Sequence, residues 1–166
     1  MEYGYNSASW LTFFSTAAEA AATLTGLIFV GASINLQLIV GNPALVARTA
    51  KALYTLTTVL LVSLVCIAPT QPPAAFGIEE TLLGAVAWVA TMRTFQASSL
   101  KNEYVSTLAK VVYFVLTQLA ALPFVADGIL VLLHLPGYGP CLLAGVVFSF
   151  ITALADAWVL LIEIQR

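Results

Sequence analysis

The chain has 166 residues, of which 61% are hydrophobic and only 8% are charged. A soluble domain carries about 25% charged residues, so this composition excludes a soluble globular protein and predicts an integral membrane protein. The net charge of -2, with only six lysines and arginines, excludes the kind of basic surface that binds nucleic acid.

Five apolar stretches are each long enough to cross a bilayer as a helix, which takes about 20 residues. Clusters of glycine, proline and asparagine separate most of these stretches. The predicted spans are 10–40, 50–69, 77–95, 111–134 and 141–164. They form a single transmembrane domain over residues 1–166, so we expect an all-α bundle of five helices embedded in the lipid bilayer.

The basic residues predict the orientation of this bundle. They fall between spans one and two, around the connection between spans three and four, and at the end of the chain: Arg48, Lys51, Arg93, Lys101, Lys110 and Arg166. With five spans, all of them lie on one side, and such loops stay in the cytoplasm. We therefore expect an outside N-terminus and a cytoplasmic C-terminus in the plasma (inner) membrane. Glu79 and Glu80 are assigned to an outer loop.

Three carboxylates lie inside the predicted spans, and we expect no basic residue near them: Glu19, Asp127 and Asp156. An acid at membrane depth costs several kcal/mol, so it is a candidate for function. At a helical rise of about 1.5 Å per residue, Glu19 lies about 13 Å and Asp127 about 10 Å from the outer surface. These two acids are expected to meet at one level, with Asp156 about 22 Å deep in a second tier. A purely structural role, in which each acid is protonated and hydrogen-bonded, stays open.

Span one carries a regular polar stripe. Its positions alternate four and three residues apart: Thr12, Thr16, Glu19, Thr23, Gly26, Val30, Ser33 and Gln37. This spacing keeps one face of a helix aligned along a seam. Lipid cannot satisfy polar groups, so the stripe must face protein or water. Helix packing and a water-lined path both explain it.

Span four contains Gln118, Pro123, Asp127 and, at its outer edge, His134. Pro123 is expected to kink the helix and open a cavity. Asp127 and His134 are seven residues apart and should share a face, so Glu19, Asp127 and His134 are weak candidates for metal ligands. An interfacial histidine without a ligand role is the alternative.

Span five carries a ridge of small residues, Gly145, Ser149, Ala153 and Ala157, one every four residues. Such a ridge permits close helix contact, and we expect it to join subunits of a homo-oligomer. Cys66 and Cys141 are interpreted as small hydrophobic residues, and a disulfide or redox pair stays open as the alternative. No motif indicates a cofactor.

The sequence favours a channel or transporter for protons or small cations, without enzymatic activity. The expected path residues are Glu19, Thr23, Gln118, Asp127 and Asp156, because unpaired acids at two depths suit a cation or proton. One alternative is a non-transporting assembly or regulatory subunit of a membrane complex. Another is a membrane enzyme or a lipid-ligand binder whose pocket lies along the kinked span four.

Overall fold

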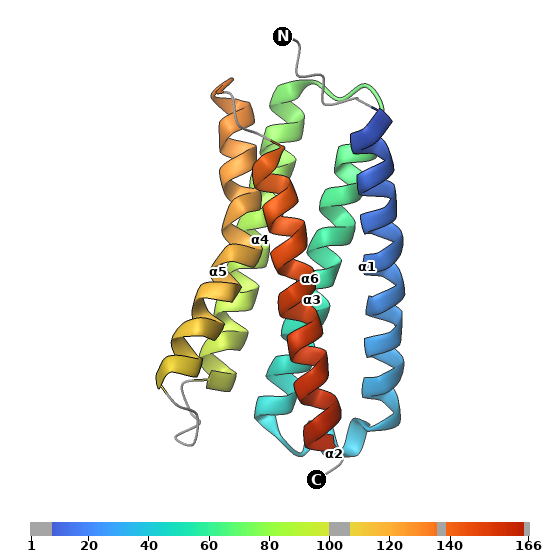
Figure 1. Ribbon diagram of the computed structural model, residues 1–166, viewed down its shortest axis with the longest axis vertical. Coiled ribbons are helices and arrows are strands. Elements are labelled where there is room, and N and C mark those ends of the chain that lie inside the picture. Colours follow the sequence, from blue (N-terminus) through green and yellow to red (C-terminus); the bar gives the residue numbers. More distant parts are fainter. Residues whose placement is uncertain (1–7, 100–106, 136–138, 165–166) are drawn as a thin grey trace.

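The computed structural model describes residues 8–99, 107–135 and 139–164, which form a bundle of long helices that alternate in direction (Figure 1). The helices are α1 (Ala8–Ile34), α2 (Leu36–Val40), α3 (Pro43–Ile67), α4 (Pro73–Ser99), α5 (Thr107–Leu132) and α6 (Pro140–Ile164). All except the short α2 are long and apolar enough to cross a membrane, five in total. No strand occurs in the described part of the chain. The prediction of an all-α chain with five apolar spans is confirmed.

Prolines begin three of the long helices, at Pro43, Pro73 and Pro140. The fixed φ angle of proline and its missing N–H suit the first helical position, where the N–H has no partner within the helix. Asn42 caps α3, because its side chain accepts a hydrogen bond from the N–H of Ala44 at 3.0 Å. The helices therefore start at these prolines, before the positions predicted from the sequence.

These earlier starts change the surroundings of three charged residues. The predicted starts of spans two and three, at residues 50 and 77, are wrong, because α3 begins at Pro43 and α4 at Pro73. Lys51 lies well inside α3, and Glu79 and Glu80 lie in the second turn of α4. The assignment of these two glutamates to an outer loop is therefore also wrong.

Two other predicted boundaries differ from the structure. Span one is not a single helix to residue 40, because the chain breaks at Asn35 between α1 and α2. α5 continues through Pro123 and stops at Leu132. His134 follows in the left-handed region, with φ 53°. Its N–H bonds the carbonyl of Val131, and the N–H of Leu135 bonds that of Leu130, which closes the helix in a Schellman motif.

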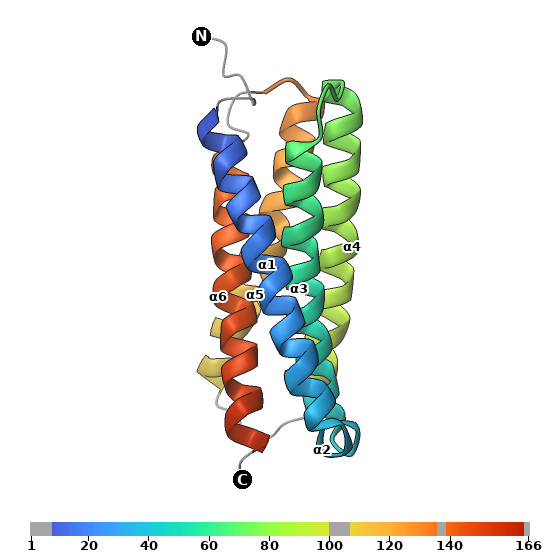
Figure 2. The ribbon, with the colours of Figure 1, turned by 90° about the vertical axis from the view of Figure 1, so that its right-hand side faces the viewer.

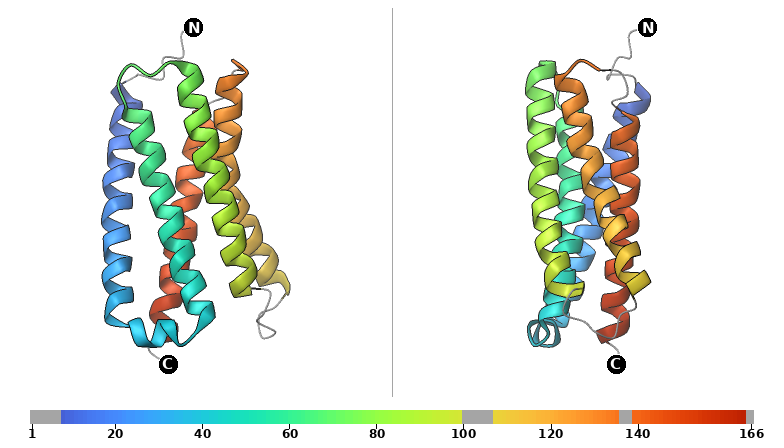
Figure 3. Two further views of the ribbon diagram at one scale, coloured as in Figure 1. Left: turned by 180° about the vertical axis from the view of Figure 1, so that it is seen from behind. Right: turned by 90° about the vertical axis from the view of Figure 1, so that its left-hand side faces the viewer.

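The contacts between helices place α3 at the centre of the bundle. α3 packs against α1, α4 and α6, while α5 packs against α4 and α6 (Figures 2 and 3). In Figure 1, α1 and α5 lie at opposite sides of the molecule. A core of apolar side chains fills the space between the helices, including Phe14, Val59, Val62, Phe124 and Val146.

Charge is unevenly distributed along the bundle. The starts of α3 and α5 and the end of α4 lie toward the end of the molecule where α2 is found (Figure 1). The basic residues on these segments are Arg48, Lys51, Arg93 and Lys110. Lys101 and Arg166 lie outside the described residues. Glu79, Glu80 and Asp127 lie toward the opposite end, near the start of α4 and the end of α5.

Candidate functional site: two buried charge clusters

The interior of the bundle holds two groups of charged side chains. The first, which we name the carboxyl pair, consists of Glu80 from α4 and Asp127 from α5. The second, which we name the ion-pair cluster, consists of Lys51 from α3, Asp156 from α6 and the ring of Tyr113 from α5. Both groups are shielded from solvent, so their charges must be satisfied inside the protein.

The carboxyl pair brings two acids together in a dry site. Glu80 is 1% exposed and Asp127 is 0% exposed, and the two carboxyl groups lie close enough to interact. Ionised carboxylates only accept hydrogen bonds, so the two groups can bond each other only when one of them carries a proton. No donor from the described residues reaches either oxygen of Glu80 or Oδ2 of Asp127. The pair is therefore arranged to hold a proton, or a cation in its place.

The other oxygen of Asp127 is fixed by the start of α6. Oδ1 accepts a hydrogen bond from the N–H of Gly139 at 2.7 Å, and the N–H of Leu142 lies near this carboxyl group. The first N–H groups of a helix have no partner within the helix and favour a negative charge. Asp127 thus links α5 to α6, whereas Glu80 has no such structural partner among the described residues.

A close contact between α4 and α5 sets the position of the carboxyl pair. Gly77 of α4 and Gly128 of α5 face each other beside the two acids. A Cβ atom added to Gly128 would lie 2.7 Å from the nitrogen of Thr81 and 2.8 Å from the carbonyl oxygen of Gly77. Only glycine permits backbones to approach this closely, as in other membrane helix contacts. The contact holds Glu80 against Asp127.

The ion-pair cluster lies toward the basic end of the bundle. Lys51 Nζ is 3.4 Å from Asp156 Oδ2, and the two side chains are 1% and 0% exposed. The same Nζ lies 3.7 Å from the centre of the Tyr113 ring, and Arg48 Cζ lies 5.7 Å from it. The expectation that no basic residue lies near the acids is therefore wrong for Asp156. Lys51 is not a loop residue, because it belongs to α3 and its side chain is buried in the bundle.

The structure separates the predicted path residues into three places. Asp127 and Asp156 are buried in its interior. Glu19 and Thr23 are exposed on α1, where the Thr23 hydroxyl donates to the carbonyl of Glu19 at 2.8 Å. Gln118 faces α4, and its Oε1 accepts a hydrogen bond from Trp88 Nε1 at 2.8 Å. The expectation that Glu19 and Asp127 meet is wrong, because Glu19 is exposed on α1 whereas Asp127 is buried on α5.

The three weak metal candidates are separated as well. Glu19 lies on the outer surface of α1, Asp127 is buried, and His134 is exposed beyond the end of α5. The helix ends before His134, so it does not share a helical face with Asp127. Over the described ranges, no group of three histidine, cysteine, aspartate or glutamate side chains is placed to hold a metal ion.

The small-residue ridge of α6 packs inside the protein. A Cβ atom added to Gly145 would lie 2.8 Å from the Phe124 ring of α5. The Ser149 hydroxyl donates to the carbonyl of Ala120 at 3.0 Å, and Ala153 is 1% exposed. The interpretation of this ridge as a subunit contact is therefore wrong, because α5 and the core already cover most of it.

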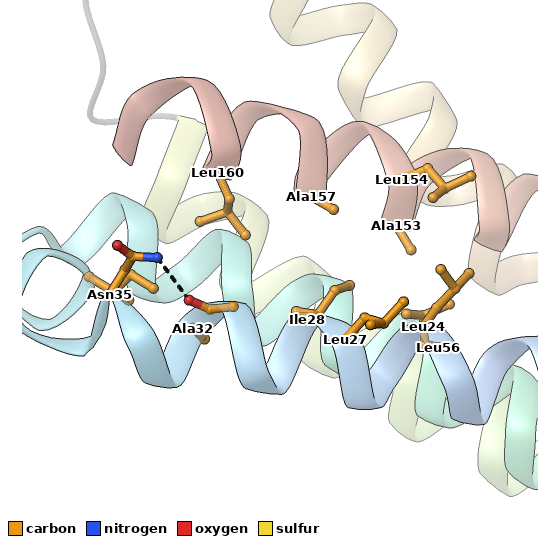
Figure 4. A pocket seen from close by; sticks show the side chains of 12 residues that line it. Leu24, Leu27, Ile28, Ala32, Asn35, Leu56, Ala153, Leu154, Ala157 and Leu160 are labelled. Atoms are coloured by element: carbon orange, nitrogen blue, oxygen red, sulfur yellow. Dashed lines mark hydrogen bonds between the residues drawn. The ribbon is translucent and has the colours of Figure 1, made fainter. Parts of the chain in front are cut away.

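A groove of about 210 Å³ lies between α1 and α6, with α3 beneath it. Figure 4 shows leucine and isoleucine side chains of α1 across from Ala153, Ala157 and Leu160 of α6. Its one strongly polar residue is Asn35, whose amide donates to the carbonyl of Gly31 at 3.0 Å. The groove suits hydrocarbon and contains no titratable group, and Pro123 does not line it.

Among the described residues, the two charge clusters therefore contain the buried acids and the buried lysine. The carboxyl pair has oxygens available to a proton or cation, whereas the charges of the ion-pair cluster neutralise each other. Glu80 and Lys51 were both missed as site residues in the sequence, although each follows a proline that can begin a helix. Comparison of the chain with protein-family models, with curated proteins and with solved structures finds no match.

Proposed function

We propose that this protein is a transporter of protons or small cations, and that the Glu80–Asp127 carboxyl pair is its ion-binding centre. The supporting observation is that two acids share a buried site in which three carboxyl oxygens receive no hydrogen bond from a donor group. Acids buried within membrane spans are typical of proton relays and ion pathways. Two adjacent buried acids favour one bound proton between them, and the site can release that proton or exchange it for a cation.

The ion-pair cluster supplies a second tier for the same path. Between the tiers, three buried hydroxyl groups belong to α5 and α6: Thr117, Ser149 and Thr152. An apolar layer that includes Phe124, Val62 and Val146 also lies in this region and is tightly packed. An ion cannot cross packed hydrocarbon, so this layer favours a carrier whose helices rearrange over a permanently open channel.

The proposed orientation follows from the uneven charge of the bundle. Loops rich in lysine and arginine stay in the cytoplasm, so we place the basic end inside and the N-terminus outside. In this orientation the carboxyl pair lies in the outer half of the plasma membrane, and Asp156 lies in the inner half. Protons from outside would reach the carboxyl pair first.

Proton flux in liposomes tests this function. Purified protein is reconstituted with a pH-sensitive dye inside, and a pH gradient is applied. We expect the wild type to carry protons, and Glu80→Gln to reduce the flux to near the protein-free background. Glutamine keeps the shape and can donate a hydrogen bond to Asp127, but it cannot exchange a proton. Glu79→Gln is the matched control, because Glu79 is exposed and bonds Gln71, and we expect its flux to be unchanged.

Two results would reject the proposal. Glu80→Gln and Asp127→Asn with wild-type flux would remove the carboxyl pair from the path. A wild type without proton or cation flux, purified in mild detergent with a stoichiometric second protein, would favour the assembly or regulatory subunit instead. Circular dichroism of each variant shows whether the helices are intact.

A further inference from the structure

The polar stripe of α1 faces away from the rest of the chain. We name its positions the α1 seam: Thr12, Thr16, Glu19, Thr23, Gly26, Val30 and Ser33, which Gln37 of the following α2 continues. Every one of these residues is exposed. In contrast, α5 and α6 expose no serine, threonine, glutamate or glutamine side chain over residues 111–132 and 140–160. The α1 seam is therefore a polar face on a bundle that otherwise presents mostly hydrocarbon outward.

Local hydrogen bonds satisfy only part of this face. The hydroxyls of Thr16, Thr23 and Ser33 donate to the carbonyls four residues earlier at 2.8–2.9 Å. The carboxyl group of Glu19 stays exposed among them. From Thr12 to Ser33 the seam extends over about 32 Å, which matches the roughly 30 Å hydrocarbon thickness of a bilayer. Lipid cannot satisfy a carboxyl group at this depth, so protein must cover it.

We propose that the α1 seam is the interface of a parallel homodimer, in which α1 of one protomer packs against α1 of a second copy. Alternation of four and three residues keeps a seam aligned with a partner helix in a left-handed coiled coil. In a parallel two-fold dimer each position meets its own counterpart, so threonine meets threonine along the seam. Two Glu19 carboxyl groups then meet at one level, where they can share a proton.

Gly26, near the middle of the seam, has room for this contact. A Cβ atom added to Gly26 would have no other atom within 4 Å, so no packing within the protomer accounts for a glycine there. Glycine at a membrane helix contact lets the partner backbone approach closely. Gly31 also has nothing within 4 Å, but it lies on another face of α1 and lines the groove shown in Figure 4. The two glycines provide a matched pair of positions.

Energy transfer between labelled protomers in liposomes, measured against protein dilution, tests the interface. We expect Gly26→Leu to weaken self-association by about tenfold or more, because the added side chain separates the helices. Gly31→Leu adds the same bulk away from the seam and should leave self-association unchanged. Equal behaviour of the two variants, or a monomeric wild type, would overturn the proposal.

Cysteine cross-linking locates the face independently. In a background with Cys66→Ala and Cys141→Ala, single cysteines replace Thr16, Thr23 or Val30 on the seam, and Phe29 off it. Disulfide-linked dimers should form at the seam positions and not with Phe29→Cys, which is exposed but turned about 90° away. Dimers that form equally well at Phe29, or cross-links to a different protein at the seam, would contradict a second copy as the partner.

Discussion

Burying a lysine beside an aspartate costs free energy because both charges lose their water. Close contacts with other groups must offset this cost. Lys51 has two such compensations, the Asp156 carboxylate at 3.4 Å and the face of the Tyr113 ring at 3.7 Å. A cation over a desolvated aromatic face is worth about 2 kcal/mol. Removing one partner of a buried ion pair leaves an uncompensated charge, whereas replacing both partners with apolar residues is often nearly neutral. This asymmetry makes the role of the ion pair measurable.

We predict that Lys51→Met destabilises the protein by about 3–5 kcal/mol, because Asp156 is left buried and unpaired. The double variant Lys51→Met/Asp156→Leu should recover most of this loss. Unfolding in mixed micelles with increasing sodium dodecyl sulfate, followed by tryptophan fluorescence, measures both values. A double variant as unstable as the single one would show that Lys51 stabilises through Tyr113 or packing rather than through Asp156.

At the scale of single residues, the sequence identified two of the buried acids but not their partners. Asp127 and Asp156 were predicted to be intramembrane because they lie deep in unbroken apolar stretches. Glu80 and Lys51 lie near the helix ends, where a shift of four to seven residues decides between loop and core. Pairing across helices also depends on rotation about each helix axis, which a single sequence does not specify.

At the scale of helices, the glycine contact between α4 and α5 is the main constraint on the carboxyl pair. Gly77, Gly84 and Gly128 all lie where an added Cβ would come within 3.0 Å of the neighbouring helix. The atoms in the way include backbone atoms, such as the nitrogen of Val125 next to Gly84. Backbone cannot move aside as a flexible side chain can, so a larger residue must push the two helices apart.

We predict that Gly128→Val destabilises the bundle by about 1–3 kcal/mol and impairs proton flux, because α4 and α5 separate next to Glu80. Gly31→Val is the control for the change from glycine to valine within a helix, since its Cβ meets open space. Detergent unfolding gives the stability difference, and the liposome assay gives the flux. Equal stability of the two variants would mean that the α4–α5 contact is less close than described.

Helix number was easier to predict than helix boundaries. Hydrophobic length alone indicates five spans, because a bilayer sets a minimum for each. The prolines at residues 43, 73 and 140 were interpreted as separators, yet each begins a helix. Both interpretations follow from the missing N–H of proline. A helix usually ends before a proline, but a proline is tolerated in the first turn of a helix. Asn42, which directly precedes Pro43, is a favoured capping residue. It was the signal that Pro43 begins a helix rather than ends one.

At the scale of the whole molecule, the bundle is asymmetric in two ways. Charge differs between its two ends, and exposed polar side chains line one of its sides. Its described basic residues lie toward one end, and the carboxyl pair lies toward the other. The α1 seam faces outward on the side opposite α5 (Figure 1). Burial of α1 in a dimer interface would leave α4, α5 and α6 exposed to lipid. The proposed ion path therefore lies within each protomer and not between the two.

Labelling of single cysteines can test which end of the bundle faces the cytoplasm. In the cysteine-free background, Pro69→Cys lies in the connection before α4 and Gln96→Cys lies near the other end of α4, and both positions are exposed. A membrane-impermeant maleimide applied to intact cells should label Pro69→Cys and not Gln96→Cys, because the proposed orientation places the basic end in the cytoplasm. Permeabilised cells should show labelling of both, which controls for reactivity. The reverse pattern would place the carboxyl pair on the cytoplasmic side, and protons would then reach Glu80 and Asp127 from inside.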